Sequence, residues 1–431
     1  MLDIKFIREN PDKVKEGISK KGADSSLVAQ VLDLDKKRRE LIQQIDTLRA
    51  KKNIAEEKLL KEKEESKKEI LEVLKQAKNV LEKKETELKE IEKEYQRSMS
   101  LIPNLPLEDV PFGKDEKDNV VLREMGKKPH WNFTPKDYLT LGESLDIIDT
   151  KRAAKTSGSR FGFLKREAAQ LEIALIHFAF DKLTKKGFIP VIPPVMIKAQ
   201  PMWAMGYLDR GRDEVYYLPK DDLYLIGTAE QIIGSMHMNE ILKGEELPLR
   251  YIAFSSCLRR EAGSYGKDTK GILRVHQFDK VEMFVFSKPE EAQKEHELLL
   301  SLEEDLMKNL GIPYRVINIC SGDLGDPAAK KYDLEAWLPG QNNGQGEYRE
   351  THSTSNCTDY QARRLNVKYL NSKTNKNEFV STLNGTALAI GRAIIAIIEN
   401  YQTKEGFIRI PKVLLPYMGG IKIIKRKLIR S

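Results

Sequence analysis

The first long pattern in the chain is a run without proline or glycine, from about residue 26 to residue 100. Apolar residues recur in it at three- and four-residue spacing, in two seams of different register. The first seam consists of Val31, Leu34, Leu41, Ile45, Leu48, Ala55 and Leu59, and the second of Ile70, Leu74, Ala77, Leu81, Leu88, Ile91 and Tyr95. The charged run KEKEESKK separates them. We therefore expect two helices that fold back as an antiparallel coiled-coil hairpin around a polar turn near Ser66, each on the order of 50 Å long.

Shorter signals flank this predicted arm. Residues 1–23 are expected to form a short helical lead-in, with Asn10-Pro11 as a helix start. Prolines at 103, 106 and 111 end the helical pattern and begin a linker. We expect an N-terminal domain at residues 1–110, with the arm at about 26–100, and a second domain at residues 111–431.

In the second domain, strand patterns mostly follow one another, and helical patterns stand apart. This order predicts an α+β fold with a mixed, largely antiparallel sheet rather than a doubly wound one. The expected helices are 163–186, the segment after 223–230 through Glu240, 289–310, 359–365 and 387–402. The expected strands are 188–195, 223–230, 251–260, 271–286, 314–320, 331–338, 346–353 and 379–383. Prolines in the strand 188–195 place it at an edge or an interface.

The expected strand pair 251–260 and 271–286 encloses a loop with three glycines and carries an unusual set of charges. These charges are Arg259, Arg260, Glu261, Lys267, Lys270, Arg274 and Glu282. A hairpin that grips a polyphosphate and reads a base would use such charges, although a solvated edge hairpin could also carry them. The chain has neither a GxGxxG after a strand nor a GxxxxGK[ST] sequence, so any nucleotide is bound without a Rossmann or P-loop cradle.

Composition narrows the class of protein. The 431 residues are 40% hydrophobic and 32% charged with a net charge of +8, as in a soluble protein with a polyanionic partner. The three cysteines are far apart, which predicts no disulfide framework, no zinc ribbon and a reducing cytoplasm. The start lacks an apolar signal core. The most apolar segment, 387–398, is too short to span a bilayer and is interrupted by Arg392.

Three further segments place polar residues beside small ones near strand ends, at 228–230, 347–355 and 382–392. Arg392 interrupts an apolar helix start, and a buried arginine requires a phosphate, a carboxylate or a structural ion pair. Glu350 fits a site or a surface strand equally well. His276 and His352 fit packed or hydrogen-bonded histidines better than metal ligands.

Several of these segments resemble motifs of class II aminoacyl-tRNA synthetases. KGFIPVIPPV, ending at Val195, resembles motif 1 with Pro194 as its interface proline. Arg259 and the following REAGSYGKDTKGILRVHQFDKVE resemble motif 2, and NGTALAIGR, ending at Arg392, resembles motif 3. Together with the start MLDIKFIRENPDKV, the arm, TAE at 228–230 and QARR at 361–364, they resemble the seryl-tRNA synthetase family over nearly the whole chain.

The resemblance implies formation of seryl-adenylate from L-serine and ATP, then transfer of serine to the 3′ end of tRNA(Ser), with tRNA(Sec) left open. It implies a cytoplasmic homodimer whose arm binds tRNA, Mg²⁺ accompanying ATP, no zinc and no membrane. The implied ATP site is Arg259, Glu261, Arg274, Val275, Phe278, Glu350, Ser353 and Arg392. The implied serine site is Thr228, Glu230, Arg259, Glu282, Asn384 and Thr386.

Within this set, Arg259 and Arg392 are the implied catalytic residues, and Glu350 and Ser353 the implied Mg²⁺ ligands. Phe278 would stack on the adenine face opposite Arg392. The loop 263–271 would meet the acceptor end of the RNA, and the basic tail 421–430 could add RNA affinity or remain solvated. Thr351, His352 and Arg260 depart from the family's usual smaller or neutral residues, so their roles are open.

The arm could be a spacer or a dimerisation element rather than an RNA-binding probe. A related ligase that charges a carrier protein is expected to lack such an arm. A coiled-coil RNA-binding protein with an inactive catalytic fold would not be expected to retain Arg259, Glu261, Glu282, Glu350 and Arg392.

Overall fold

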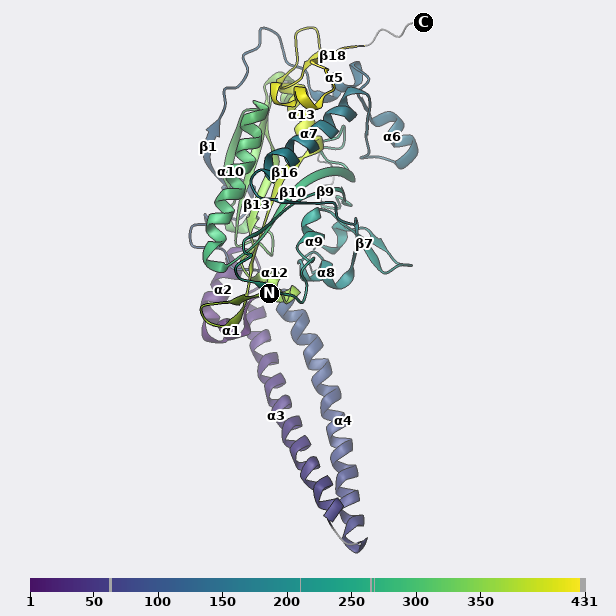
Figure 1. Ribbon diagram of the computed structural model, residues 1–431, viewed down its shortest axis with the longest axis vertical. Coiled ribbons are helices and arrows are strands. Elements are labelled where there is room, and N and C mark those ends of the chain that lie inside the picture. The colour runs from purple at the N-terminus through teal and green to yellow at the C-terminus, as the bar shows by residue number, and fades with distance from the viewer. Residues whose placement is uncertain (62–63, 210, 264–265, 267, 427–431) are drawn as a thin grey trace. The chain divides into compact units, whose positions relative to one another are not determined.

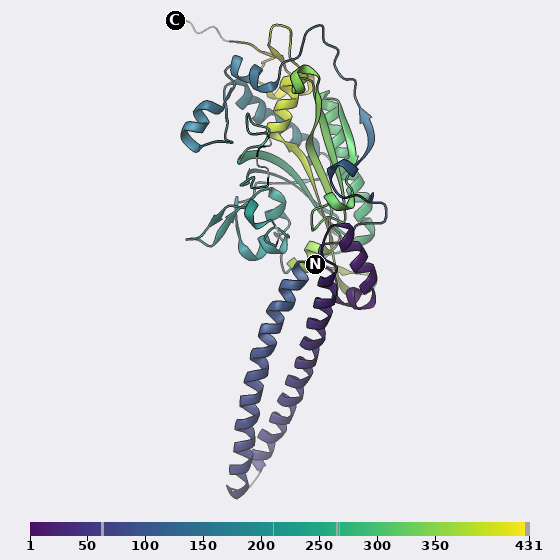
Figure 2. The same ribbon diagram turned by 180° about the vertical axis from the view of Figure 1, so that it is seen from behind.

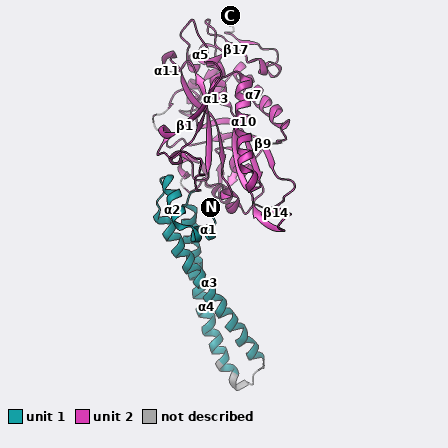
Figure 3. Cartoon of the chain, turned by 90° about the vertical axis from the view of Figure 1, so that its left-hand side faces the viewer, with its two compact units in different colours: residues 1–103 teal, residues 104–431 magenta. Residues whose placement is uncertain are grey.

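The N-terminal part of the chain is helical in this computed structural model, which describes residues 1–61, 64–209, 211–263, 266 and 268–426. The chain divides into two compact units, Met1–Pro103 and Asn104–Ser431 (Figure 3). The first unit contains α1 (Ile4–Glu9), α2 (Pro11–Lys20), α3 (Ser26–Lys61) and α4 (Glu64–Ser100). Pro11 occupies the first position of α2, where its missing N–H leaves no intrahelical bond unmade.

Helices α3 and α4 pack along each other as the predicted arm (Figure 1). Seam residues such as Leu41 and Ile45 are buried, and the remaining members of both seams are buried or half-buried. Polar contacts between the helices, such as Arg49 Nη2 to Glu85 Oε1 at 2.7 Å, fit an antiparallel pair. The predicted turn at Ser66 is wrong by a few residues, because Ser66 lies inside α4. Charged residues occur in exposed helices as well as in the turns between helices, so composition alone did not locate the end of one helix and the start of the next.

The second unit is built around an eight-stranded sheet in the order β1-β11-β12-β13-β16-β10-β9-β4. All neighbours are antiparallel except β4 and β9, which run parallel, so the predicted α+β class with a largely antiparallel sheet is confirmed. The strands are β1 (Val120–Met125), β4 (Ile189–Val191), β9 (Leu249–Leu258), β10 (Gln277–Ser287), β11 (Tyr314–Asn318), β12 (Lys330–Leu338), β13 (Glu347–Asn356) and β16 (Ser381–Ala389). The proline-containing β4 lies at the edge, as the sequence predicts.

Three helices pack on this sheet and form its main core. They are α7 (Glu167–Thr184), α10 (Ala292–Leu310) and α13 (Ile390–Asn400). Figure 1 shows them beside the strands of the sheet, and Figure 2 gives the opposite view. None of the helices in the described ranges is both long and apolar enough to cross a membrane.

The remaining elements of the second unit are short. The helices are α5 (Tyr138–Ser144), α6 (Thr150–Ser157), α8 (Ala199–Ala204), α9 (Ala229–Ile233), α11 (Gln341–Gly344) and α12 (Tyr360–Leu365). The strands are β2 (Ile148–Asp149), β3 (Phe163–Leu164), β5 (Met196–Lys198), β6 (Tyr217–Leu218), β7 (Leu223–Leu225), β8 (Ile241–Lys243), β14 (Lys368–Asn371), β15 (Lys376–Phe379), β17 (Ile408–Arg409) and β18 (Ile423–Ile424).

Several predicted boundaries are wrong. The expected helix 163–186 begins with strand β3, and α7 starts only at Glu167. The return strand of the hairpin begins at Gln277 rather than residue 271, so Arg274 lies in the connection. The helix expected through Glu240 ends at Ile233. The segment AsnGlyThr at 384–386 lies within the central strand β16, which therefore holds both Asn384 and Thr386.

Candidate active site

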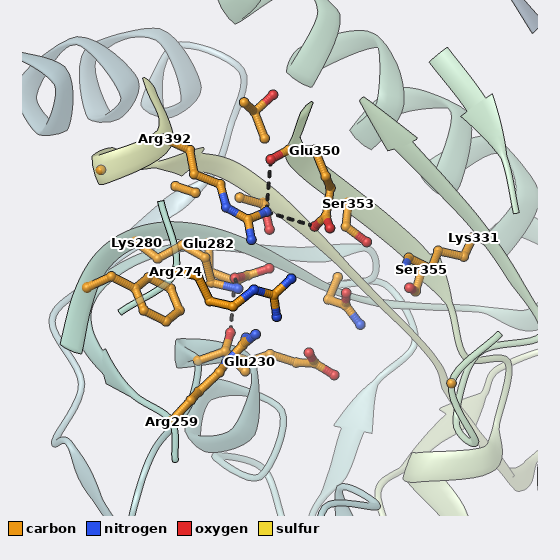
Figure 4. Close-up of a pocket in the computed structure, with 18 of the residues that line it drawn as sticks. Glu230, Arg259, Arg274, Lys280, Glu282, Lys331, Glu350, Ser353, Ser355 and Arg392 are labelled. Atoms are coloured by element: carbon orange, nitrogen blue, oxygen red, sulfur yellow. Dashed lines mark hydrogen bonds and ion pairs between the residues drawn. The ribbon is translucent and has the colours of Figure 1, made fainter. Parts of the chain in front are cut away.

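A cavity of about 420 Å³ lies over the central strands of the sheet. Every site residue predicted from the sequence lines it (Figure 4). Thr228 and Glu230 come from the start of α9; Arg259, Glu261, Arg274 and Val275 from the β9–β10 connection; Phe278 and Glu282 from β10; Glu350 and Ser353 from β13; Asn384 and Thr386 from β16; and Arg392 from α13. The chain thus gathers in one cavity residues that are up to 164 positions apart between Thr228 and Arg392.

The alternation of side chains along β10 explains one wall of the cavity. Phe278, Lys280 and Glu282 are two residues apart, so they point to the same face of the sheet. Asn384 and Thr386 have the same spacing on the neighbouring β16. Thr386 stands opposite Glu282 in the register of the two strands.

A β-bulge in β13 brings Glu350 and Ser353 to the same wall. In a regular strand, residues three apart point to opposite faces. Here the pairing of β12 with β13 shifts between Leu334, opposite His352, and Glu335, opposite Glu350, so Thr351 is an extra residue. Glu350, Thr351 and Ser353 therefore all line the cavity.

Two buried carboxylates lie at one part of the cavity. Glu230 is 7% exposed and Glu282 is 2% exposed. Thr228 Oγ1 donates a hydrogen bond to Glu282 Oε2 at 3.0 Å. Glu230 accepts from Tyr207 Oη at 2.7 Å and from Gln361 Nε2 at 3.2 Å. Burial, with the charge of Glu282 as a second cause, raises the pKa of Glu230 above its ordinary value.

Arginines line the opposite part of the cavity. Arg392 Nη1 donates to the backbone oxygen of Glu350 at 2.8 Å and lies 3.3 Å from its Oε1. Arg274 Nη1 donates to Glu261 Oε2 at 3.0 Å. Each guanidinium is thus paired with a carboxylate in this structure, and each has the donors that bind phosphate oxygens.

Arg259 links the two parts of the cavity. Its Nε donates to the backbone oxygen of Gly227 at 3.0 Å, directly before Thr228. Its guanidinium carbon lies 5.2 Å from the centre of the Phe278 ring. These two contacts fix the position of the Arg259 side chain in the cavity.

The oxygen atoms around Glu350 fit a hard divalent cation. The Glu350 side chain is 48% exposed; desolvation in the cavity acts to raise its pKa, but Arg392 and Lys331 outweigh this effect and hold the pKa below its ordinary value. A carboxylate and the Ser353 hydroxyl on one wall can supply two of the ligands that Mg²⁺ shares with phosphates and water. The described part of the chain has no cluster of three or more His, Cys, Asp or Glu side chains able to enclose a metal.

The residues with open roles lie around this wall. His352 is 1% exposed, and burial lowers its pKa to about 4, which favours the neutral imidazole. Its Nδ1 lies 2.8 Å from Thr351 Oγ1. Arg260 places its guanidinium carbon 5.8 Å from the Tyr216 ring centre and does not line the cavity. His276 Nδ1 lies 3.0 Å from the backbone oxygen of Arg259.

The predicted loop 263–271 is described only in part, and Lys267 lies outside the described residues, as does the end of the basic tail from residue 427. The return of the loop is anchored by Tyr138, whose Oη accepts a hydrogen bond from Ile272 N at 3.0 Å. A Cβ at Gly271 would lie 1.9 Å from that oxygen, so only glycine fits. Asp268 pairs with Arg349 on β13.

Sequence reasoning missed four polar residues that line the cavity: Tyr207, Lys280, Lys331 and Ser355. Lys280 was detectable, because it precedes Glu282 by two residues in a predicted strand. Ser355 follows Ser353 by the same spacing. Tyr207 and Lys331 lie in segments without a motif, and their place depends on tertiary structure.

Comparison with known proteins agrees with this geometry. Residues 1–106 match the family model of the seryl-tRNA synthetase N-terminal domain, and residues 216–401 match that of the tRNA synthetase class II core domain (G, H, P, S and T). A serine–tRNA ligase of Thermobifida fusca is 45% identical over 97% of this chain and 98% of its own. A counterpart of Thermococcus onnurineus is 45% identical over 98% of this chain and 97% of its own.

Among solved structures, the seryl-tRNA synthetase of Pyrococcus horikoshii complexed with ATP superposes with a TM-score of 0.91 and is 44% identical, covering 99% of this chain and 100% of its own. The cytoplasmic enzyme of Naegleria fowleri in complex with AMP has a TM-score of 0.87 at 36% identity, covering 99% of both chains. The motif order, the fold and both family models agree over nearly the whole sequence. The chain therefore belongs to the seryl-tRNA synthetase family of class II aminoacyl-tRNA synthetases.

Proposed function

We propose that this chain joins L-serine to the 3′ end of tRNA(Ser) in two steps, of which the first consumes ATP. The proposal rests on one cavity that is lined both by the buried carboxylates Glu230 and Glu282 and by arginines. These arginines are Arg259, Arg274 and Arg392. Serine and ATP carry complementary groups, namely an ammonium, a carboxylate and an oligophosphate. The N-terminal family match argues against a relative that charges a carrier protein.

In the first step, a carboxylate oxygen of serine attacks the α-phosphorus of ATP in line, and the bond to the pyrophosphate breaks. This reaction needs no proton transfer by the protein, so the residues act through position and charge. Arg259 holds the α-phosphate and the serine carboxylate. Arg392 lies against the adenine and the terminal phosphate, and Arg274 contacts the triphosphate.

Adenine is held between Phe278 and Arg392, with Glu261 and Val275 at its edge. Stacking on Phe278 suits the π-face of the base. In the structure the Arg259 guanidinium lies near this ring, 5.2 Å from its centre. Nucleotide entry would therefore require the ring and the guanidinium to adjust to each other.

Mg²⁺ would be held by Glu350 and Ser353. It would supply positive charge to the phosphates of ATP. The bulge at Thr351 supports this assignment, because it turns both oxygen ligands toward the cavity.

The serine subsite consists of Thr228, Glu230, Glu282, Asn384 and Thr386. A pocket that must hydrogen-bond the hydroxyl rejects alanine, because an unpaired buried polar group lowers reaction efficiency by up to roughly 10⁴-fold. In the second step, the 3′-terminal ribose of the tRNA attacks the seryl carbonyl, and AMP leaves.

For the domains, we propose that residues 1–110 bind the tRNA body through the arm and that residues 111–431 carry the chemistry. A homodimer is supported by apolar side chains exposed around edge strand β4, at Ile189, Ile192 and Met196. A cytoplasmic location is supported by three cysteines that are all free and buried.

Amino-acid-dependent exchange of ³²P between pyrophosphate and ATP tests the first step. Serine should support exchange, whereas threonine, alanine and glycine should support far less. An enzyme that binds ATP but shows no exchange with serine would refute the proposal. Charging assays with tRNA(Ser) and tRNA(Sec) then define the RNA substrates.

A further inference from the structure

Lys280 lies beside Glu282 in the cavity, and the family resemblance gave it no role. It sits on β10, two residues before Glu282, and its ammonium forms an ion pair with Glu282 Oε2. Both side chains are buried: Lys280 is 6% exposed and Glu282 is 2% exposed. Figure 4 shows the two next to each other above Arg259 and Glu230. A buried lysine in a substrate cavity requires an explanation, because burying a charge is costly unless it is paired.

The balance of charges around the serine subsite explains why this lysine is there. Glu230 and Glu282 contribute two negative charges, and Arg259 and Lys280 contribute two positive ones. Zwitterionic serine adds one charge of each sign. With the serine carboxylate on Arg259 and Lys280 on Glu282, a single carboxylate, Glu230, is left for the serine ammonium.

The hydrogen bonds fit the same division. Glu230 accepts hydrogen bonds from two neutral donors, Tyr207 and Gln361, and no lysine or arginine in the described ranges forms an ion pair with it. Glu282 forms an ion pair with Lys280 and also accepts a hydrogen bond from Thr228. An ammonium entering the cavity therefore gains more at Glu230, whereas Glu282 can accept a hydrogen bond from a neutral hydroxyl.

We propose that Lys280 is a specificity-determining positioning residue, which neutralises Glu282 so that Glu230 binds the serine ammonium and Glu282 reads the serine hydroxyl. The inference rests on the proposed function. It divides the work of two carboxylates that the family resemblance assigns together to serine.

Steady-state exchange kinetics of variants test the assignment. Lys280→Met should raise the KM for serine by ~10-fold or more and change the KM for ATP by less than about threefold, because an unpaired Glu282 competes for the ammonium. Lys280→Arg keeps the charge and should recover most of the loss. Lys294→Met, on the exposed surface of α10, is the matched control and should stay within about twofold of wild type.

A double variant separates charge neutralisation from simple packing. Lys280→Met combined with Glu282→Gln removes both charges, so its KM for serine should be lower than that of Lys280→Met alone. If Lys280 served only packing, the two losses would add. Comparable folding of all variants is checked by thermal denaturation, and the arginine and double variants remain informative if Lys280→Met does not fold.

The two carboxylates should also separate by substrate. Glu230→Gln should lower kcat/KM for serine and alanine alike, whereas Glu282→Gln should mainly reduce the preference for serine over alanine. Wild-type enzyme without serine exchange would refute the proposed function. An active wild type with an unchanged serine KM in Lys280→Met, or with additive losses in the double variant, would refute this inference alone.

Discussion

Arg392 and Glu350 contact each other across the cavity, with Nη1 of Arg392 2.8 Å from the backbone oxygen of Glu350 and 3.3 Å from its Oε1. The pair joins the start of α13 to the bulged part of β13. It holds a proposed phosphate ligand beside a proposed metal ligand. In the absence of nucleotide, each charge stabilises the other, so the site is charge-balanced before substrates enter.

This pair leads to a prediction about magnesium. Glu350→Gln should raise the Mg²⁺ concentration that gives half-maximal exchange by ~10-fold or more, because an amide is a weaker ligand than a carboxylate. Titration of exchange with MgCl₂ at fixed ATP measures the change. Chelation with EDTA should stop exchange in wild type. A Mg²⁺ requirement in Glu350→Gln equal to that of wild type would remove Glu350 from the metal site.

Arg259→Ala should lower kcat/KM for exchange by on the order of 10² or more. The guanidinium is proposed to meet charge that develops at the α-phosphorus, and loss of such a donor has about this effect. Arg260→Ala is the adjacent control, since Arg260 lies over Tyr216 and outside the cavity lining, and it should change exchange only a few-fold. A change within twofold for Arg259→Ala would refute its role.

Removal of residues 24–100 should leave serine-dependent exchange largely intact and abolish tRNA charging. The arm and the cavity belong to different compact units, and each of them has its own buried apolar residues. Exchange and charging measured on the same preparation make the comparison. Charging that survived the deletion would make the arm a spacer.

The pH dependence of serine use should follow Glu230, the only ionisable group proposed to hold the ammonium. Burial, and next the charge of Glu282, raises its pKa, so Glu230 takes up a proton at a higher pH than an ordinary carboxyl. As pH falls, the KM for serine should therefore rise before the KM for ATP does. Exchange kinetics between about pH 5 and pH 8 test this order, and parallel changes in both KM values would contradict it.

Glu303 provides a prediction about stability. It lies on α10, is 0% exposed, and neither carboxylate oxygen has a hydrogen-bond partner among the described residues. Burial, followed by the charges of Asp333 and Glu282, raises its pKa well above the ordinary 4.5. Above about pH 4.5 the folded state thus keeps a proton that the unfolded chain has lost. Glu303 therefore lowers the free energy of unfolding as pH rises above about 4.5.

Glu303→Gln should consequently stabilise the protein, by on the order of 1 kcal/mol or more at pH 8 and by little at pH 5. The amide keeps the shape of the side chain and cannot ionise. Thermal unfolding at both pH values measures the difference. Equal shifts at pH 5 and pH 8 would mean that the ionisation of Glu303 does not contribute.

The sequence predicted much of this architecture, for identifiable reasons. Apolar residues such as Leu41 and Ile45 recur at helical spacing over a long stretch, so periodicity alone was enough to predict the arm. The site residues emerged from motif resemblance, and the cavity brings all of them together. The expected strand 379–383 and the expected helix 387–402 left AsnGlyThr at 384–386 outside both, whereas pairing with β10 and β13 holds this segment as a strand.

The sequence could not predict which residues of each strand pair with which residues of the neighbouring strand. The bulge at Thr351 depends on how β13 pairs with β12, which periodicity in one segment does not reveal. Lys331 and Tyr207 likewise reach the cavity only through tertiary packing.

The bulge also makes the site depend on how β13 pairs with β12, as well as on which residues it contains. Deleting Thr351 would leave Glu350 and Ser353 two positions apart, a spacing that a regular strand places on one face. If Thr351 stayed but entered the ladder as an ordinary strand residue, strict alternation would turn Glu350 to the face opposite Ser353. The two oxygen side chains therefore share one wall only while the extra residue stays outside the ladder, so a change in strand pairing could separate them without altering either residue.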